Sequence, residues 1–189
     1  TNLNWSYSSL SQVNTTNVDK LLPAWIFQTG DFELGLQSTP IVIDGIIYLA
    51  AVDDAFAIDG ATGRQIWHYI YEPLPGFRRG RNWGVAVANG KVFLNTRDAH
   101  LVALDQQTGQ EVWSVATADA TSCVPGCSGA AAPLVANDKV IVSNKGPRGA
   151  ISAFDIKTGR LVWRFYTIPG PGEKGHETWS GDSWKKGDV

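Results

Sequence analysis

An eleven-residue pattern, Ala-x-Asp-x-x-Thr-Gly-x-x-x-Trp, occurs three times without a gap and constrains the fold more than any other feature. The copies end at Trp67, Trp113 and Trp163, and a degenerate copy runs from Asn17 to Trp25. The four tryptophans are separated by 42, 46 and 50 residues. A repeat of this length is typical of propellers and other architectures built from stacked units.

Each copy of the pattern predicts a β-hairpin with a polar tip. The aspartates at its start are Asp59, Asp105 and Asp155. An aspartate in this position accepts hydrogen bonds from backbone N–H groups of the turn, and the glycine is free to adopt positive φ. The segments on both sides are strand-like, and the second one ends in the tryptophan.

A second hairpin precedes each copy. Asp44-Gly45, Asn89-Gly90 and the weaker Asn137-Asp138 lie between apolar runs, which is the strongest short-range hairpin signal. Four short strands per repeat predict an all-β chain of propeller blades rather than a two-sheet sandwich. We therefore expect one partial propeller over 1–189, with about four units ending near Trp25, Trp67, Trp113 and Trp163. These tryptophans are expected to pack against neighbouring blades, which is a structural role.

Composition excludes several other classes of protein. The chain is 43% hydrophobic and 18% charged, so it is globular rather than disordered. Its net charge of −2 argues against a nucleic-acid-binding surface. No apolar run is long enough to span a membrane, and the first residues do not form a signal peptide. Because methionine is absent, we expect a processed mature form or a piece of a longer protein.

Two cysteines, Cys123 and Cys127, flank a Pro-Gly turn that can bring their sulfurs together. A disulfide is the preferred interpretation, with free thiols as the alternative. A disulfide implies an export compartment, where it would shape the loop and add little through chain entropy.

Two charged clusters have both a structural and a functional interpretation. Arg78, Arg79 and Arg81 are expected to be a solvated loop, and otherwise an anion contact. A second group lies on a Pro/Gly-rich segment, where a structural loop is favoured over a metal or acid–base site. It consists of Glu173, His176, Glu177 and Asp182. His68 and His100 are expected to be packed or exposed rather than catalytic.

The repeat resembles the tryptophan-docking motif of the quinoprotein dehydrogenases, the eight-bladed propellers that depend on pyrroloquinoline quinone (PQQ). Several further stretches resemble the methanol and ethanol dehydrogenase branch. They are 10–18, 22–25, Gln37-Ser-Thr-Pro40, Asn82-Trp-Gly-Val-Ala86, Arg148-Gly149 and the long run 163–185. The resemblance covers essentially the whole chain. It implies that four units form about half of a ring.

The resemblance also implies a function and a set of site residues. It implies an exported, periplasmic dehydrogenase that oxidises primary alcohols with PQQ and a Ca²⁺ or lanthanide ion. The positions that match the family's cofactor site are Gln37, Arg81, Asn82, Trp83, Ala130 and Ser143. Gln37 replaces a metal-binding glutamate, and Trp83 replaces an arginine that contacts the cofactor. The family's adjacent cysteine pair has no counterpart at 77–81, and its catalytic aspartate follows the stretch that ends near Lys185.

Two functional hypotheses follow. The first is the N-terminal half of a PQQ-dependent alcohol dehydrogenase, which would take a small alcohol and would be inactive as this chain alone. The alternative is a non-catalytic propeller segment, a binding or assembly module with a degenerate cofactor site. In either case a half-ring would expose apolar blade faces, so we expect association of copies or a C-terminal half that covers them. A WD-type scaffold is disfavoured because the tryptophan follows Thr-Gly.

Overall fold

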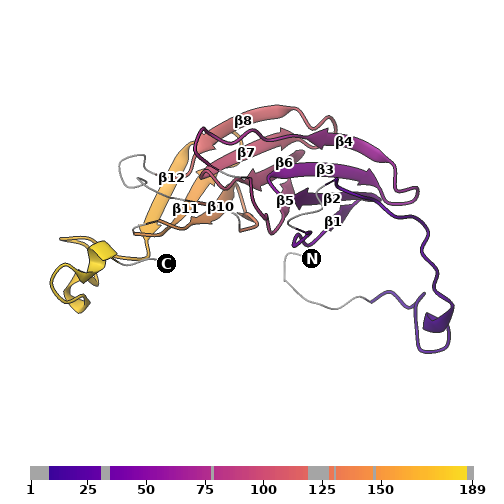
Figure 1. The fold of residues 1–189 in the computed structure, drawn as a ribbon, viewed down its shortest axis with the longest axis horizontal. Helices are drawn as coiled ribbons and strands as arrows, with labels where there is room; N and C mark the ends of the chain where they lie inside the picture. Colours follow the sequence, from indigo (N-terminus) through magenta and orange to yellow (C-terminus); the bar gives the residue numbers. More distant parts are fainter. Residues whose placement is uncertain are drawn as a thin grey trace.

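The computed structural model describes residues 9–30, 35–77, 79–118, 128–129, 131–146 and 148–186. These residues form three four-stranded antiparallel sheets, which lie one after another along an arc (Figure 1). The first blade contains β1 (Ile41–Ile43), β2 (Ile46–Ala51), β3 (Asp54–Asp59) and β4 (Gln65–Tyr69). The second contains β5 (Val85–Ala88), β6 (Lys91–Asn95), β7 (His100–Asp105) and β8 (Glu111–Ala116). The third contains β9 (Leu134–Ala136), β10 (Lys139–Asn144), β11 (Ala150–Asp155) and β12 (Leu161–Tyr166).

Strands follow one another in chain order in every blade, so each blade is a simple meander. The predicted all-β propeller class is confirmed. Short 3₁₀ helices lie outside the blades. They are η1 (Val18–Lys20), η2 (His176–Thr178) and η3 (Ser183–Lys186). No helix in the described part of the chain is long and apolar enough to cross a membrane.

The first hairpin of each blade forms where the sequence predicts it. Asp44 and Gly45 both have positive φ, as do Asn89 and Gly90, which is the backbone that a two-residue turn of this type requires. Asn137 adopts positive φ in the third blade. The weaker Asn-Asp signal therefore produces the same hairpin.

The second hairpin is closed by the repeated aspartate. Asp105 Oδ1 accepts the backbone N–H groups of Gln107 (3.0 Å) and Thr108 (2.8 Å) and the Thr108 hydroxyl (2.9 Å). Asp59 and Asp155 make the same three contacts in their own blades. Hydrogen bonds to the charged form lower the pKa of all three carboxyls, beginning with those from the turn threonine.

Both hairpin turns of a blade lie at the same end of the sheet, which we call the turn end. Gly60 N–H donates to Gly45 O at 2.8 Å in the first blade. Gln106 N–H donates to Gly90 O in the second (2.9 Å), and Ile156 N–H donates to Asp138 O in the third (2.9 Å). The opposite end, which we call the loop end, carries the β2–β3, β6–β7 and β10–β11 connections and the longer links between blades.

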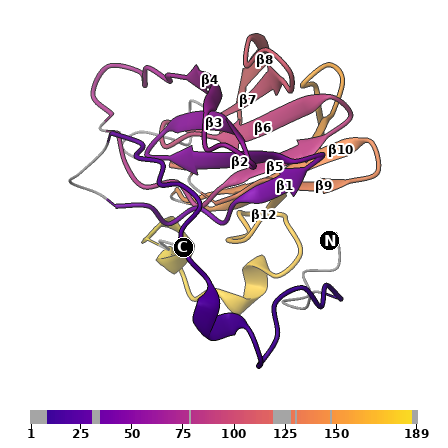
Figure 2. The ribbon, with the colours of Figure 1, turned by 90° about the vertical axis from the view of Figure 1, so that its right-hand side faces the viewer.

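The blades pack face to face, and an apolar core lies between each pair. Between the first and second blades it includes Tyr48, Trp67, Val92, Leu94 and Leu104. The core between the second and third blades includes Phe93, Leu101, Val140, Val142 and Phe154. Figure 2, turned by a right angle, shows the blades stacked in this order.

The unit that ends at Trp25 differs from the other three. Residues 9–30 and 35–40 contain η1 and no strand. This segment contains Pro23, whose nitrogen cannot donate to a strand ladder, and no described strand pairs with it. The described residues therefore form three four-stranded blades, not the expected four. Trp25 and Phe27 pack against the outer face of the first blade, beside Phe56 and Ile58.

Candidate functional site

Three buried carboxylates organise the loop end between the first two blades. Asp53 and Asp54 come from the β2–β3 connection and the start of β3, and Asp98 comes from the β6–β7 connection. All three bind parts of the link between β4 and β5, which runs over 70–84. This link carries Asn82 and Trp83, two of the predicted cofactor residues.

Asp54 binds the start of the link and an arginine farther along it. Its Oδ1 accepts the Tyr71 backbone N–H at 3.2 Å and pairs with Arg79. Its Oδ2 lies 2.9 Å from His68 Nε2, and the His68 ring stacks on Phe56 with centroids 4.1 Å apart. Arg79 is therefore part of an ion pair. The same contacts give His68 a packed, structural position.

Asp98 binds the middle of the link. Its carboxylate accepts the Tyr71 hydroxyl at 2.9 Å, the Leu74 backbone N–H at 2.9 Å and the Thr96 hydroxyl at 2.6 Å. Burial by itself would raise the Asp98 pKa. These hydrogen bonds, together with nearby His100, bring that pKa below its ordinary value.

Asp53 binds the last part of the link. It is fully buried and accepts the backbone N–H groups of Gly80 and Arg97, each at 3.2 Å. Burial raises the pKa of Asp53 to about 6, and these hydrogen bonds only partly offset that effect. A Cβ at Gly80 would lie 2.4 Å from the Arg97 side chain, so a larger residue there would require Arg97 to move.

The predicted site residues next along the chain have different environments. Asn82 is buried and structural: its Nδ2 donates to Asn95 O at 2.8 Å, and its Oδ1 accepts Gly84 N–H at 3.1 Å. Trp83 is 57% exposed, and its Nε1 donates to Gln37 Oε1 at 3.2 Å. Arg81 is exposed. The structure thus brings Gln37 and Trp83 together.

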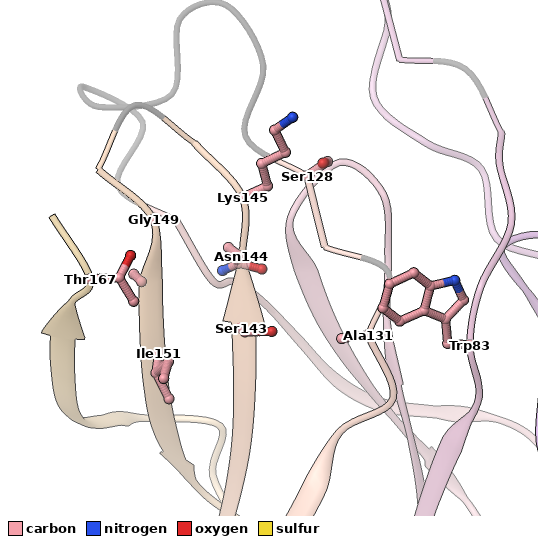
Figure 3. A pocket seen from close by; sticks show the side chains of 10 residues that line it. Trp83, Ser128, Ala131, Ser143, Asn144, Lys145, Gly149, Ile151 and Thr167 are labelled. Carbon is pink, nitrogen blue, oxygen red and sulfur yellow. The ribbon is translucent and has the colours of Figure 1, made fainter. Parts of the chain in front are cut away.

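A cavity of about 410 Å³ opens between Trp83 and the loop end of the third blade (Figure 3). Its wall on the third blade includes Ser143 and Asn144 at the end of β10 and Ile151 on β11. The remaining lining residues are Ser128, Ala131, Lys145, Gly149, Ala150 and Thr167. Trp83 and Ser143, sixty positions apart in the sequence, therefore line the same cavity.

Buried amides lie against this cavity wall. Asn95 Nδ2 donates to Ser143 O (3.2 Å), but Asn95 Oδ1 and both side-chain polar atoms of Asn144 have no hydrogen-bond partner among the described residues. Both amides contact Gly129, where a Cβ would come within 2.5 Å of Asn95 Oδ1. Unpaired buried polar atoms cost about 1–3 kcal/mol each, so these amides are an unfavourable feature of the packing behind the cavity.

The described residues offer poorer ligands for a metal ion than for a polar organic group. Among the described residues no group of three or more His, Cys, Asp or Glu side chains could hold a metal ion. Gln37 offers a neutral amide oxygen, and in this structure that oxygen accepts the Trp83 indole N–H. This part of the chain fits an organic cofactor better than a hard cation.

Several sequence expectations can be placed more briefly. Ala130, Cys123, Cys127 and Arg78 lie outside the described residues. Glu173 pairs with Arg148 and accepts Gly170 N–H at 2.8 Å, and the His176 ring packs on Trp184. The 169–184 segment is therefore held by its own polar and aromatic contacts and by Arg148 of the third blade's β10–β11 connection.

Sequence reasoning missed Asn144 in the cavity wall, Asn95 behind it and the three carboxylates that bind the β4–β5 link. A local signal existed for two of the carboxylates, since Asp53 and Asp54 come one residue after a largely buried strand. The asparagines carried no such signal, since each contacts a residue from a distant loop.

Comparison with known proteins assigns this architecture to a class. A family model described as "Glucose/ethanol/alcohol dehydrogenase, beta-propeller domain" matches residues 1–189. A quinohemoprotein alcohol dehydrogenase, ADH-IIG of Pseudomonas putida, is 38% identical over 94% of this chain and 27% of its own length. The lanthanide-dependent methanol dehydrogenase of Methylacidiphilum fumariolicum is 35% identical over 97% of this chain and 34% of its own.

Solved structures agree. The crystallised ADHIIG of Pseudomonas putida HK5 superposes with a TM-score of 0.82 at 37% identity, covering 95% of this chain and 29% of that protein. A europium-containing methanol dehydrogenase gives 0.81 at 34% identity over 95% and 36%. The fold is thus that of a quinoprotein-type β-propeller.

The chain belongs to the PQQ-dependent glucose/ethanol/alcohol dehydrogenase propeller family. It spans about a quarter to a third of the length of the curated relatives that it matches. The resemblance to the quinoprotein dehydrogenases found in the sequence is confirmed.

Proposed function

We propose that this chain forms part of a PQQ-dependent dehydrogenase that oxidises small primary alcohols, and that the cavity beside Trp83 holds part of the quinone. The observation that carries the proposal is the meeting of Trp83 and Ser143 in one cavity, because both positions match the family's cofactor site. When bound, PQQ supplies the oxidising quinone. The chain's own residues bind and orient it.

The cavity offers groups that suit a planar, polar cofactor. The Trp83 indole provides a flat apolar wall, and the exposed Ser143 hydroxyl is available for a hydrogen bond. The carboxylates at 53, 54 and 98 hold the link that carries Trp83, so this wall is fixed before any ligand binds. Preorganisation of this kind reduces the entropic cost of binding.

Localisation and the metal belong to the same proposal. The family and the named relatives support an exported, periplasmic protein with Ca²⁺ or a lanthanide beside the quinone. Of the predicted residues, Gln37 is the candidate metal contact in this chain, through its amide oxygen. The acidic ligands that a hard cation prefers would then come from elsewhere in the protein.

Titration with PQQ tests the proposal. PQQ is added to the protein with and without Ca²⁺ or a lanthanide, and tryptophan fluorescence and quinone absorbance are followed. Trp83→Ala is expected to raise the dissociation constant at least about tenfold. Trp184→Ala, which changes a tryptophan in η3 away from the cavity, is the control and should leave it unchanged. Absence of binding, or equal binding by both variants, would reject the proposed site.

A second candidate is a non-catalytic binding or assembly module. It is supported by the hydrogen bond between Gln37 and Trp83, which pairs two residues that differ from the family's charged site residues. Dye reduction with ethanol separates the two functions when it is measured on a longer protein that contains this chain together with the rest of the propeller. Such a protein that binds PQQ, with metal present, and reduces no dye would be a binding module.

A further inference from the structure

The second and third blades share a threonine contact at the loop end. In the second blade, the backbone N–H and the hydroxyl of Thr117 donate to Ala99 O, each at 2.8 Å, and Thr117 is fully buried. Thr167 of the third blade lies four residues after its repeat tryptophan, as Thr117 does. Its N–H donates to Gly149 O and its hydroxyl to Arg148 O, each at 3.2 Å. The threonine contact is therefore longer in the third blade.

The longer contact lies in the cavity wall. Gly149 and Thr167 both line the cavity, on the side away from Trp83 (Figure 3). They come from two separate segments, the β10–β11 connection and the residues that follow β12. If these segments separate, the cavity loses its shape on this side. A group that holds them together therefore decides where a ligand can lie.

Arg148 joins the two segments. Its Nε donates to Ile168 O at 3.0 Å, and its carbonyl oxygen accepts the Ile168 N–H at 2.9 Å. The guanidinium lies over the Tyr166 ring, 3.9 Å from the ring centroid, and a Cβ on Gly170 would come within 3.2 Å of it. Arginine suits this position because its planar group can stack on an aromatic ring and donate hydrogen bonds in its own plane.

Glu173 completes the arrangement around the guanidinium. Its carboxylate pairs with Arg148 and accepts the Gly170 N–H at 2.8 Å. Its backbone N–H donates to Gly170 O at 3.0 Å, so side chain and backbone both fix this turn. Ile168, just before the turn, is fully buried. The residues after β12 are thus held in place on the far side of Thr167 from the strand.

We propose that Arg148 and Glu173 are positioning residues of the cavity, which hold Thr167 against Gly149 and so fix the wall that a bound ligand meets. Neither residue is among those that line the cavity, so their effect on a ligand passes through Thr167. The third blade has this arrangement where the threonine contact is longer than in the second blade. The effect on ligand binding rests on the proposed function, whereas the effect on the wall does not.

Hydrogen exchange followed by NMR in the unliganded protein tests the effect on the wall. Glu173→Gln removes the charge that pairs with Arg148. It is expected to raise the exchange rates of the Thr167 and Ile168 amides about fivefold, the upper end for a partly exposed ion pair. Glu177→Gln is the matched control, because it changes a carboxylate of the same segment that accepts the Gly175 N–H at 3.1 Å. It should leave both rates unchanged.

Titration with PQQ tests the effect on the ligand. Glu173→Gln should raise the dissociation constant about two- to fivefold, the limit being the factor by which the wall is destabilised. Glu177→Gln should leave it unchanged. Arg148→Lys keeps the positive charge but loses the Nε contact with Ile168 O, so it should raise the exchange rates and the dissociation constant at least as much. An unchanged urea midpoint shows that Glu173→Gln acts locally and not through the fold as a whole.

The outcomes separate this inference from the proposed function. Unchanged exchange of Thr167 and Ile168 in Glu173→Gln would overturn the inference. Faster exchange with unchanged PQQ affinity would overturn the positioning role and leave the proposed function intact. If the natural sequence binds no PQQ, the proposed function fails, and the exchange rates still decide whether Arg148 and Glu173 hold the wall.

Discussion

The turn end and the loop end of the blades are held in different ways. At the turn end, every blade uses the same local device, in which Asp59, Asp105 or Asp155 binds its own turn and a tryptophan from the preceding unit covers the glycine. At the loop end the contacts differ from blade to blade. There, Asp53, Asp54 and Asp98 bind the β4–β5 link, which joins the first blade to the second.

We infer from this difference that the turn end mainly serves stability and that the loop end is where a ligand would bind. A repeated local device can fasten blades in any number, because each copy needs only its neighbour. The loop end is free to vary in each blade, and the cavity beside Trp83 lies there. The predictions below are arranged to break one end while leaving the other intact.

The largest effect is expected when the turn end loses a covered tryptophan. Trp67→Ala should lower the free energy of unfolding by about 3–5 kcal/mol, because a buried indole and its hydrogen bond to Gln106 O are lost. Trp163→Ala, measured on dilute monomer, should cost less than about 1 kcal/mol because this ring is half exposed. Urea unfolding measures both. Equal losses of unfolding free energy would contradict the difference in burial between Trp67 and Trp163.

The next effect concerns the bare glycine under the indole. Gly109→Ala should cost about 3 kcal/mol, since it combines a positive φ of 71° with a Cβ 2.7 Å from the Trp67 ring. Gly90→Ala is the matched control: its φ is 70°, and nothing lies within 4 Å of the added Cβ. It should cost about 1 kcal/mol from backbone strain alone. A Gly109 variant no less stable than the Gly90 variant would contradict the close packing of the Trp67 indole on Gly109.

The pH dependence of the loop end is expected to be no larger than the effect of Gly109→Ala. Because burial raises the Asp53 pKa from 3.8 to about 6, the folded state binds this proton more tightly than the unfolded state. The Asp53 contribution is therefore fully present below pH 3.8 and is lost as the pH rises to about 6. The loss is up to about 3 kcal/mol, since one pKa unit is about 1.4 kcal/mol.

Asp53→Asn removes this titration and supplies the control. Denaturant unfolding between pH 4 and 7 should show the stability of the natural sequence falling relative to the variant. The turn end has the opposite sign, since the lowered pKa values of Asp59, Asp105 and Asp155 stabilise the fold above pH 3.8 and lose that effect on acidification. A constant difference between Asp53→Asn and the natural sequence would show that Asp53 is not buried as described.

How well the sequence predicts each end follows from the same contrast. The turns at Asp44-Gly45 and Asn89-Gly90, and the aspartate turns, depend on residues within a few positions of one another, so the pattern is sufficient. The contact between Asp98 and Leu74 joins residues from different blades, and no local pattern indicates it. The meeting of Trp83 with Ser143 required the family resemblance.

The N-terminal unit shows where pattern reasoning goes too far. The eight-residue step from Asn17 to Trp25 correctly indicated a tryptophan related to the repeat, and its indole reaches Gly60 and Gly63. The step carried no information about partner strands, so the expected fourth sheet is absent from the described residues. A repeat tryptophan can thus pack on the turn of the next unit even where its own unit forms no four-stranded sheet among the described residues.

Hydrogen exchange measured with and without PQQ tests the division between the two ends most directly. On binding, the account predicts added protection at Trp83 and at 143–145 and 149–151, which line the cavity, and no change in the turns at 59–63, 105–109 and 155–159. Protection spread equally over both ends, or confined to the turns, would contradict it.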